Sequence, residues 1–203
     1  MLLAAINCDK KSIDLTETDM TTQLEKIWQE IESWNDIHKN TDLGSYLNDP
    51  ASDHEIDDLN KQLGGRLPVE FLDSLRRHNG TVCWTTKFCD GCLFDAKSVL
   101  STLHDMRGIA KDLIDANIRN GYGDDSPLNT SGSVKSDLWS DHWIPFHATD
   151  WSKTCFDFDP EIGGEMGQII SVNWEGNSVS VVAKNYVEFL DLCAKSLPDD
   201  PDE

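Results

Sequence analysis

A short acidic stretch in the C-terminal half of the chain holds the densest set of residues that could do chemistry. The stretch contains Asp157, Asp159, Glu161 and Glu165. Carboxylates grouped in this way can bind a divalent cation or act as a general acid and base. If residues 154–159 form a strand, Asp157 and Asp159 point to the same face, and Phe156 and Phe158 point to the core. Carboxylates on an open sheet face are usually solvated, so the pattern favours a contact surface for a partner over catalysis.

Three cysteines suggest a zinc site. Cys89 and Cys92 have the C-x-x-C spacing of zinc ligands, and Cys83 precedes them. A structural zinc site needs four ligands, usually with a second close pair. The sequence offers no second pair, so His78 or His104 would have to complete the site. Buried or turn cysteines are the better interpretation, since the Cys-Asp-Gly-Cys stretch fits a hairpin turn equally well.

Aromatic residues border a polar loop and form the third candidate feature. Trp139, Trp143 and Trp151 fit core packing with one exposed ring, and an aromatic anchor in a protein interface is the alternative. No G-x-S-x-G elbow and no phosphate-binding glycine-rich loop occurs in the sequence. We therefore expect no enzymatic activity, no bound metal and no cofactor.

Composition limits the class of partner. The chain has 203 residues, 38% of them hydrophobic, and a formal net charge of −20. This length and this apolar content indicate one folded domain with a sizeable core. The negative charge disfavours binding to nucleic acid or to an anionic membrane. It favours a basic protein partner, such as one that itself acts on nucleic acid, with mere solubility as the open alternative.

The ends of the chain and its hydropathy predict location and domain boundaries. The apolar start, residues 1–6, lacks the basic region and the length of a secretory signal. No run approaches the roughly 20 apolar residues of a membrane span. We therefore expect a cytoplasmic protein whose six cysteines are reduced. Residues 1–18 are predicted to form an arm, 19–197 a single domain, and 198–203 a frayed acidic tail.

Helices dominate the first half of the predicted domain. Apolar residues at helical spacing predict a helix over about 19–38. Ser52 and Glu55 form a capping box that begins a second helix, which ends at Gly64-Gly65. Leu67-Pro68 begins a third helix, because proline fits the first turn, and Asn79-Gly80 ends it. A fourth helix is predicted over 96–117.

Strands dominate the second half. Short extended pieces are predicted at 81–84 and 92–94, and the residues 119–142 read as the longest loop. Further strands are predicted at 143–147, 154–159, 167–174 and 178–183, the last two as a hairpin. Asn185 caps a final helix. This order predicts an α+β fold with a single, mostly antiparallel sheet and helices packed on one side.

The order of these motifs resembles the Smi–Knr superfamily, often called SUKH. The residues that carry the resemblance are Ser52, Glu55, Leu67, Pro68, Phe71, Asn79, Gly80, Trp143, Pro145, Pro160 and Gly167, and they are expected to be structural. The similarity covers roughly residues 20–197. It implies an α+β fold without catalysis.

The resemblance also implies a function in binding proteins. Bacterial members of the superfamily are commonly immunity proteins that neutralise a cognate toxin, often a nuclease or deaminase. Fungal relatives regulate cell-wall assembly, so a regulatory scaffold is the alternative. The chain departs from the superfamily at residues 148–153, where many relatives have a more glycine-rich hairpin.

These considerations predict a non-enzymatic immunity protein that binds a basic toxin through an acidic surface. The residues expected to contact the partner are Asp137, Asp141, Asp150, Trp151, Asp157, Asp159, Glu161 and Glu165. Complementary charge would steer the toxin into the complex and cover its active site or substrate channel.

Overall fold

The computed structural model describes residues 17–38, 46–82, 90–119, 129–137, 139–173 and 177–197. The acidic tail and all but the last two residues of the predicted arm lie outside these ranges. So do Cys83 and Cys89, and with them half of the predicted strand at 81–84 and the first cysteine of the C-x-x-C stretch.

Five helices form where the sequence predicts them. They are α1 (Glu17–His38), α2 (Asp53–Gln62), α3 (Val69–Arg77), α4 (Ala96–Arg119) and α5 (Tyr186–Lys195). Ser52 caps α2 in a complete capping box, because its hydroxyl accepts from the Glu55 amide while the Glu55 carboxylate accepts from the Ser52 amide. Asn185 caps α5 by accepting from the Glu188 amide at 2.9 Å. Among the described helices, none has the length and apolar content that crossing a membrane requires.

A six-stranded sheet follows the helices, in the order β1-β3-β4-β5-β6-β2. Its strands are β1 (Cys92–Leu93), β2 (Asn129–Ser131), β3 (Trp143–Ala148), β4 (Lys153–Asp157), β5 (Gln168–Asn173) and β6 (Ser178–Ala183). All neighbours pair antiparallel except β2, which runs parallel to β6 at the edge. The α+β prediction is confirmed, although β2 was expected to be loop.

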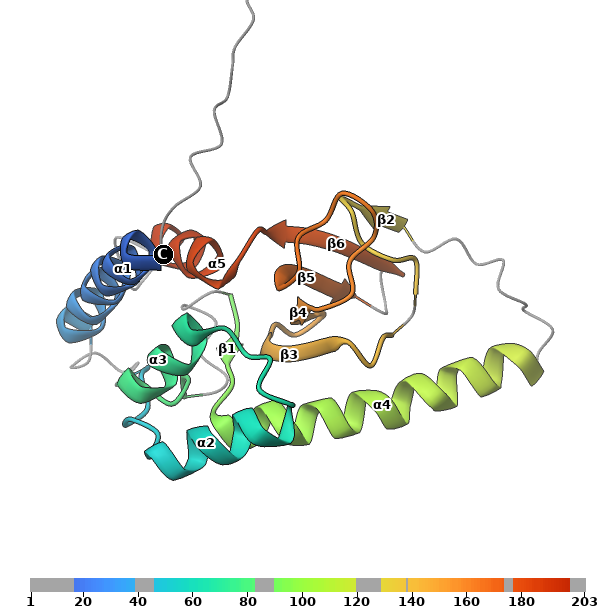
Figure 1. The fold of residues 1–203 in the computed structure, drawn as a ribbon, viewed down its shortest axis with the longest axis horizontal. Coiled ribbons are helices and arrows are strands. Elements are labelled where there is room, and N and C mark those ends of the chain that lie inside the picture. Colours follow the sequence, from blue (N-terminus) through green and yellow to red (C-terminus); the bar gives the residue numbers. More distant parts are fainter. Residues whose placement is uncertain are drawn as a thin grey trace, which may run out of the picture.

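The helices cover one face of the sheet and build the main core there. Figure 1 shows them to the left of and below the strands, with α4 running past the sheet at its C-terminal end. Phe71 of α3 lies at the centre, with its ring edge against Phe146, Phe156 and Tyr186 at centroid distances of 5.3–5.8 Å. Edge-to-face contacts of this kind add to the hydrophobic gain of burial.

A second, smaller core covers the opposite face. Residues 132–142, which we call the strap, lead from β2 at one edge of the sheet back to β3. Val134 of the strap is buried, and Trp139 packs edge-on against the fully buried Trp143 at 5.8 Å. The remaining members of this core are Cys155, Ile170, Val172 and Val179. The face that the sequence suggested would be open is therefore closed by the strap.

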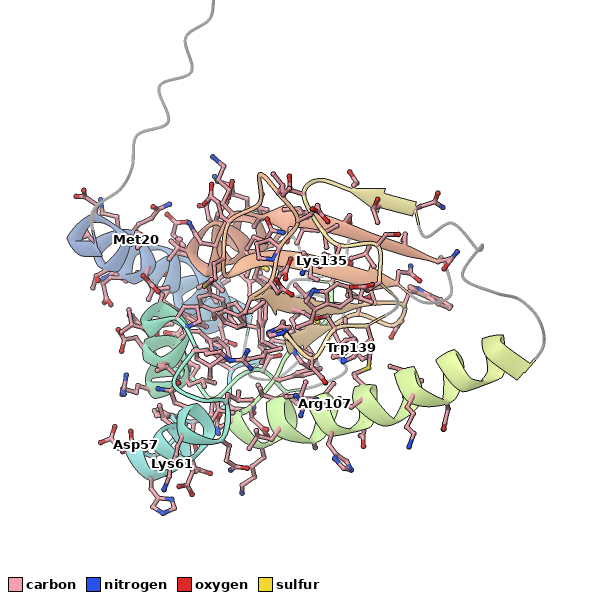
Figure 2. The ribbon with its side chains drawn as sticks, turned by 45° about the vertical axis from the view of Figure 1, so that its right-hand side comes forward. Met20, Asp57, Lys61, Arg107, Lys135 and Trp139 are labelled. Carbon is pink, nitrogen blue, oxygen red and sulfur yellow. The ribbon has the colours of Figure 1, made fainter. Side chains whose placement is uncertain are left out.

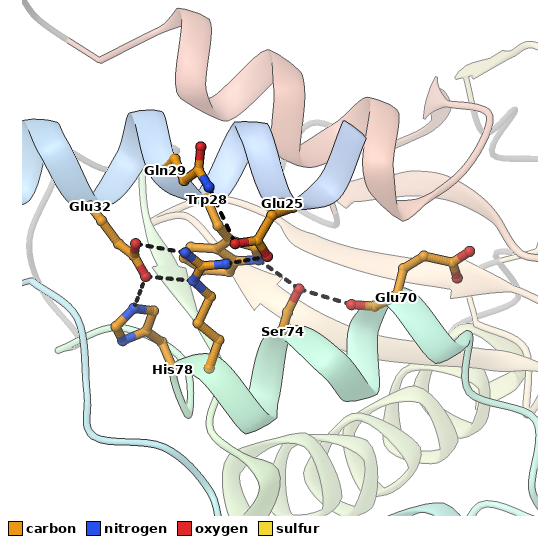
Figure 3. A network of polar contacts seen from close by, with 8 residues as sticks. Glu25, Trp28, Gln29, Glu32, Glu70, Ser74 and His78 are labelled. Carbon is orange, nitrogen blue, oxygen red and sulfur yellow. Dashed lines mark hydrogen bonds and ion pairs between the residues drawn. The ribbon is translucent and has the colours of Figure 1, made fainter. Parts of the chain in front are cut away.

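A polar network joins α1 to α3 and to the residues after it (Figure 3). The Arg77 guanidinium donates to Glu32 at 2.5 Å and to Glu25 at 2.6 Å, and His78 lies 2.9 Å from Glu32. The hydrogen bond from Arg77 holds the pKa of Glu32 below its ordinary value. Glu25, Glu32 and His78 each have a partner of opposite or complementary character in this network. The network therefore holds α1 and α3 together and needs no ligand to account for it.

Candidate functional site

Asp157 is a buried structural residue. Its side chain is fully enclosed, and its carboxylate accepts hydrogen bonds from the Trp143 indole at 3.2 Å and the Gln168 amide at 3.0 Å. It also accepts from the backbone amide of Asp159 at 3.0 Å. The interpretation of Asp157 as an exposed contact residue is wrong, because the strap covers the face to which it points.

The chain after Asp157 forms an ordered excursion between β4 and β5. We call residues 158–167 the acidic loop. The β4 strand ends at Asp157 rather than at residue 159, so Asp159 is free of the sheet pairing. The Gly167 amide donates back to the Asp157 carbonyl at 2.7 Å, which closes the base of the loop. The Gly164 amide donates to the Glu161 carbonyl at 2.9 Å, which adds a turn at its tip.

The strap supports the acidic loop from below. Gln168, at the start of β5, donates to the Ser133 carbonyl of the strap at 2.9 Å and accepts from the Glu165 amide at 3.2 Å. Gly164 passes so close to the strap that a Cβ built on it would lie 2.6 Å from the Ser133 carbonyl oxygen. The absence of a side chain at Gly164 therefore allows the two segments to pack against each other.

Lys135 lies in the strap, on the side of the sheet that carries the acidic loop (Figure 2), and its ammonium pairs with Asp159 of that loop. The Lys135 ammonium donates to the Asp159 carboxylate at 2.5 Å, and this hydrogen bond lowers the pKa of Asp159. The same bond, together with the nearby charges of Asp159, Asp137 and Glu161, raises the pKa of Lys135. Asp159 alone forms an ion pair with Lys135, and the charges of Asp137 and Glu161 act on this lysine from farther away, so negative charge exceeds positive charge locally.

Asp141 lies farther along the strap and has its own partner. It accepts from the Arg107 guanidinium of α4 at 2.8 Å, in an exposed ion pair. The structure therefore brings together Asp137, Asp159 and Glu161 around Lys135, and places Glu165 on the same acidic loop. Asp141 adds less available charge than the sequence suggested, because Arg107 neutralises it.

Asp150 and Trp151 lie at the opposite end of the β3–β4 pair. Ala148 pairs with Lys153 there, whereas Trp143 pairs with Asp157 at the end next to the acidic loop. The Trp151 ring is 66% exposed beside a groove of about 220 Å³ that Met106, Ile109 and Val172 also line. The prediction of core packing with one exposed ring is confirmed, and the predicted contact residues divide between two separate surfaces.

Cysteine chemistry differs from the sequence-based expectation. Cys92 and Cys193 are disulfide-bonded, so the prediction of reduced thiols is wrong for both of them, and Cys92 has no thiolate for a zinc ion. Cys155 is a free, fully buried thiol whose pKa is raised by burial. In the described part of the chain, no three His, Cys, Asp or Glu side chains come close enough to hold a metal ion. Disulfides persist in oxidising compartments, and the cytoplasmic location stays a prediction.

Two apolar residues of the acidic loop escaped the sequence analysis. Ile162 is 93% exposed and Met166 is 78% exposed. Each follows a glutamate directly, Glu161 or Glu165, and lies among turn residues. The glycines and glutamates on either side of them could have indicated their exposure, because an apolar side chain in such a turn has no core to face.

Comparison with known proteins places the chain in a family. A family model described as the SMI1 / KNR4 family (SUKH-1) matches residues 50–192, which is well over half of the chain. The matched segment begins just before the capping box of α2 and ends within α5, so it includes the sheet, the strap and the acidic loop. A comparison with curated proteins finds no match.

Proposed function

Because the chain belongs to the SMI1 / KNR4 family (SUKH-1), we propose that it is a non-enzymatic immunity protein that binds and neutralises a cognate toxin. Binding proteins of this kind inhibit by occupying a surface, so they need contact residues rather than a reactive constellation. The proposed toxin is basic and acts on nucleic acid, since an active site that holds phosphates must carry positive charge.

The observation that carries this proposal is the cluster of exposed carboxylates at one end of the sheet. Asp159 pairs with Lys135 in a partly buried ion pair, the exposed Asp137 and Glu161 act on the same lysine through their charge, and the exposed Glu165 follows on the same ordered loop. Charge of this density attracts a basic partner over a distance and raises the rate of association. The overall charge of −20 acts in the same direction. We propose that the toxin docks at this end, with Asp141 at its margin and with Asp150 and Trp151 outside the central contact.

Coexpression in a bacterial host tests the proposal. The probe is the C-terminal domain of the protein encoded immediately upstream of this chain, and the measurements are host growth and the affinity of the purified pair. We expect full protection by the natural chain, and an affinity at least about tenfold weaker after reversal of Asp137, Glu161 and Glu165 to Lys. Rising salt is expected to weaken association of the natural pair.

A matched control separates local from overall charge. Reversal of Asp57, Asp58 and Asp105, which are exposed on α2 and α4, changes the net charge equally but leaves the acidic loop intact. We expect the affinity of this variant to stay within about threefold of the natural chain. Absence of any protection or complex would contradict the proposed immunity function. Equal losses of affinity in both variants would contradict the proposed surface.

A further inference from the structure

Solvent surrounds two apolar side chains of the acidic loop almost completely. Ile162 and Met166, at 93% and 78%, are the most exposed large hydrophobic residues in the described part of the chain. Isoleucine favours strands and is a poor turn former, yet Ile162 occupies a turn beside Gly163. Neither side chain stabilises the fold, because its apolar surface remains in water.

The backbone that carries these side chains is held in place from several sides. The backbone N–H of Gln168 donates to the backbone carbonyl of Glu165 at 3.0 Å, and Gly164 lies against Ser133 of the strap. Asp157 anchors the base of the loop through the Asp159 amide. A contact surface that is ordered before binding loses less conformational entropy on association, so apolar side chains mounted on it bind more strongly.

Carboxylates border the apolar pair. Glu161 precedes Ile162, Glu165 precedes Met166, and both glutamates are exposed. Protein interfaces commonly have an apolar centre with a polar rim that excludes water from it. Ile162 and Met166 supply the apolar part of such a surface, and the two exposed glutamates supply acidic groups directly beside them in the chain.

We infer that Ile162 and Met166 form the apolar centre of a protein-binding surface whose partner offers an apolar hollow bordered by lysine and arginine. The two side chains protrude, so the complementary surface is concave. A basic cleft with an apolar floor has this chemistry. The inference deepens the proposed function and rests on it for the identity of the partner as a toxin, whereas the class of surface follows from the loop itself.

The groove beside Trp151 is the competing surface. It is also apolar, with Ile109 45% exposed and Trp151 66% exposed. However, its lining includes both Asp150 and Lys153, so its charge selects no particular class of partner. The acidic loop is preferred because an exposed glutamate directly precedes each of its apolar side chains, and because Lys135 beside it is already paired with Asp159.

Three synthetic peptides of equal length test this chemistry without a toxin. The first combines a central Leu-Trp-Leu with flanking lysines and arginines, the second replaces the central residues by serine, and the third replaces the basic residues by serine. Titration of the full chain, followed through its amide NMR signals, measures the affinity and the place of binding. We expect the first peptide to perturb residues 158–167 and to bind at least about fivefold more tightly than either other peptide.

Two double variants complete the test. Ile162→Ser with Met166→Ser is expected to reduce binding of the first peptide to the level of the second peptide, while Ile109→Ser with Trp151→Ser leaves it unchanged. Unchanged amide dispersion elsewhere confirms that each variant is folded. Equal binding of the first two peptides, or perturbation centred on the Trp151 groove, would overturn the inference. Neither result bears on protection of the host, so the proposed function stands or fails separately in the coexpression experiment.

Discussion

The two ends of strand β4 carry similar residues and use them differently. At one end, Asp150 and Trp151 occupy a short turn that the Thr149 hydroxyl holds by accepting from the amides of Trp151 and Ser152. At the other end, the carboxylate of Asp157 is buried and supports the longer acidic loop. This loop exposes the carboxylates of Glu161 and Glu165 to solvent.

The buried carboxylate of Asp157 fixes the base of the acidic loop, and the loop then holds the acidic residues that follow at the protein surface. Asp157 and Asp159 are only two positions apart, but the first accepts three hydrogen bonds inside the protein and the second forms a partly buried ion pair with Lys135. The turn at Trp151 is held instead by the Thr149 hydroxyl, which is shorter in reach and carries no charge. Predictions that separate the two ends therefore test how the acidic loop is built.

Replacement of Asp157 by Ala is expected to have the largest effect. The substitution leaves the Trp143 indole and the Gln168 amide without their buried acceptor, which should lower the free energy of unfolding by about 3 kcal/mol. Urea unfolding followed by tryptophan fluorescence measures the change. Asp150→Ala, at the other end of β4, should stay within about 0.5 kcal/mol of the natural chain. Similar losses in both variants would show that Asp157 has no special structural role.

Gly164→Ala is expected to separate the acidic loop from the strap. The added Cβ would lie 2.6 Å from the Ser133 carbonyl oxygen, so one segment must move, at a cost of about 1–2 kcal/mol. Gly108→Ala provides the control, since Gly108 is exposed on α4 with nothing near its Cβ position. Alanine there should raise the free energy of unfolding by about 0.5–1 kcal/mol, because it favours helix. A stabilising effect at Gly164 would contradict the tight packing.

Trp151→Ser is expected to have little effect on stability. The ring is 66% exposed, so its removal should change the free energy of unfolding by less than about 0.5 kcal/mol. Thermal unfolding measures this difference. A larger loss would mean that the Trp151 turn supports the sheet as the acidic loop does, and the distinction between the two ends would disappear.

The smallest expected effect is a change in one pKa. Lys135 lowers the pKa of Asp159, so their interaction stabilises the fold above the unfolded-state pKa and is lost as the pH falls through the folded-state pKa. Lys135→Met should raise the pKa of Asp159 towards its ordinary value. Carboxyl-carbon NMR titration measures this pKa in both chains. An unchanged pKa would mean that the ion pair is absent in solution.

The sequence predicted the elements well where the signals are local. The capping box at Ser52 and the cap at Asn185 depend on residues three positions apart, and both helices begin as expected. Strand β2 escaped prediction because Asn129–Ser131 has no apolar alternation and is fully exposed. Its only reason to be extended is pairing with β6, which lies far away in the sequence.

The candidate site was predictable only in part, for the same reason. The alternation of the strand correctly placed the Asp157 and Phe156 side chains on opposite faces of the sheet. No local pattern, however, reveals that the strap covers the face to which Asp157 points. Glu161 and Glu165 were recognised from their charge. Ile162 and Met166 were missed because an apolar residue carries no sign of exposure until the shape of the loop around it is known.

The path of the strap sets an order of assembly. Val134 shares a core with Val179, and Gly132 lies against Val181, so these contacts of the strap require β6 to be in place. Contacts between segments so far apart in the chain form late in folding, since their loop-closure entropy must be met first. During synthesis, the support beneath the acidic loop therefore stays incomplete until β6 has left the ribosome. We therefore expect the surface proposed to recognise a partner to acquire its final shape only after β6 is in place.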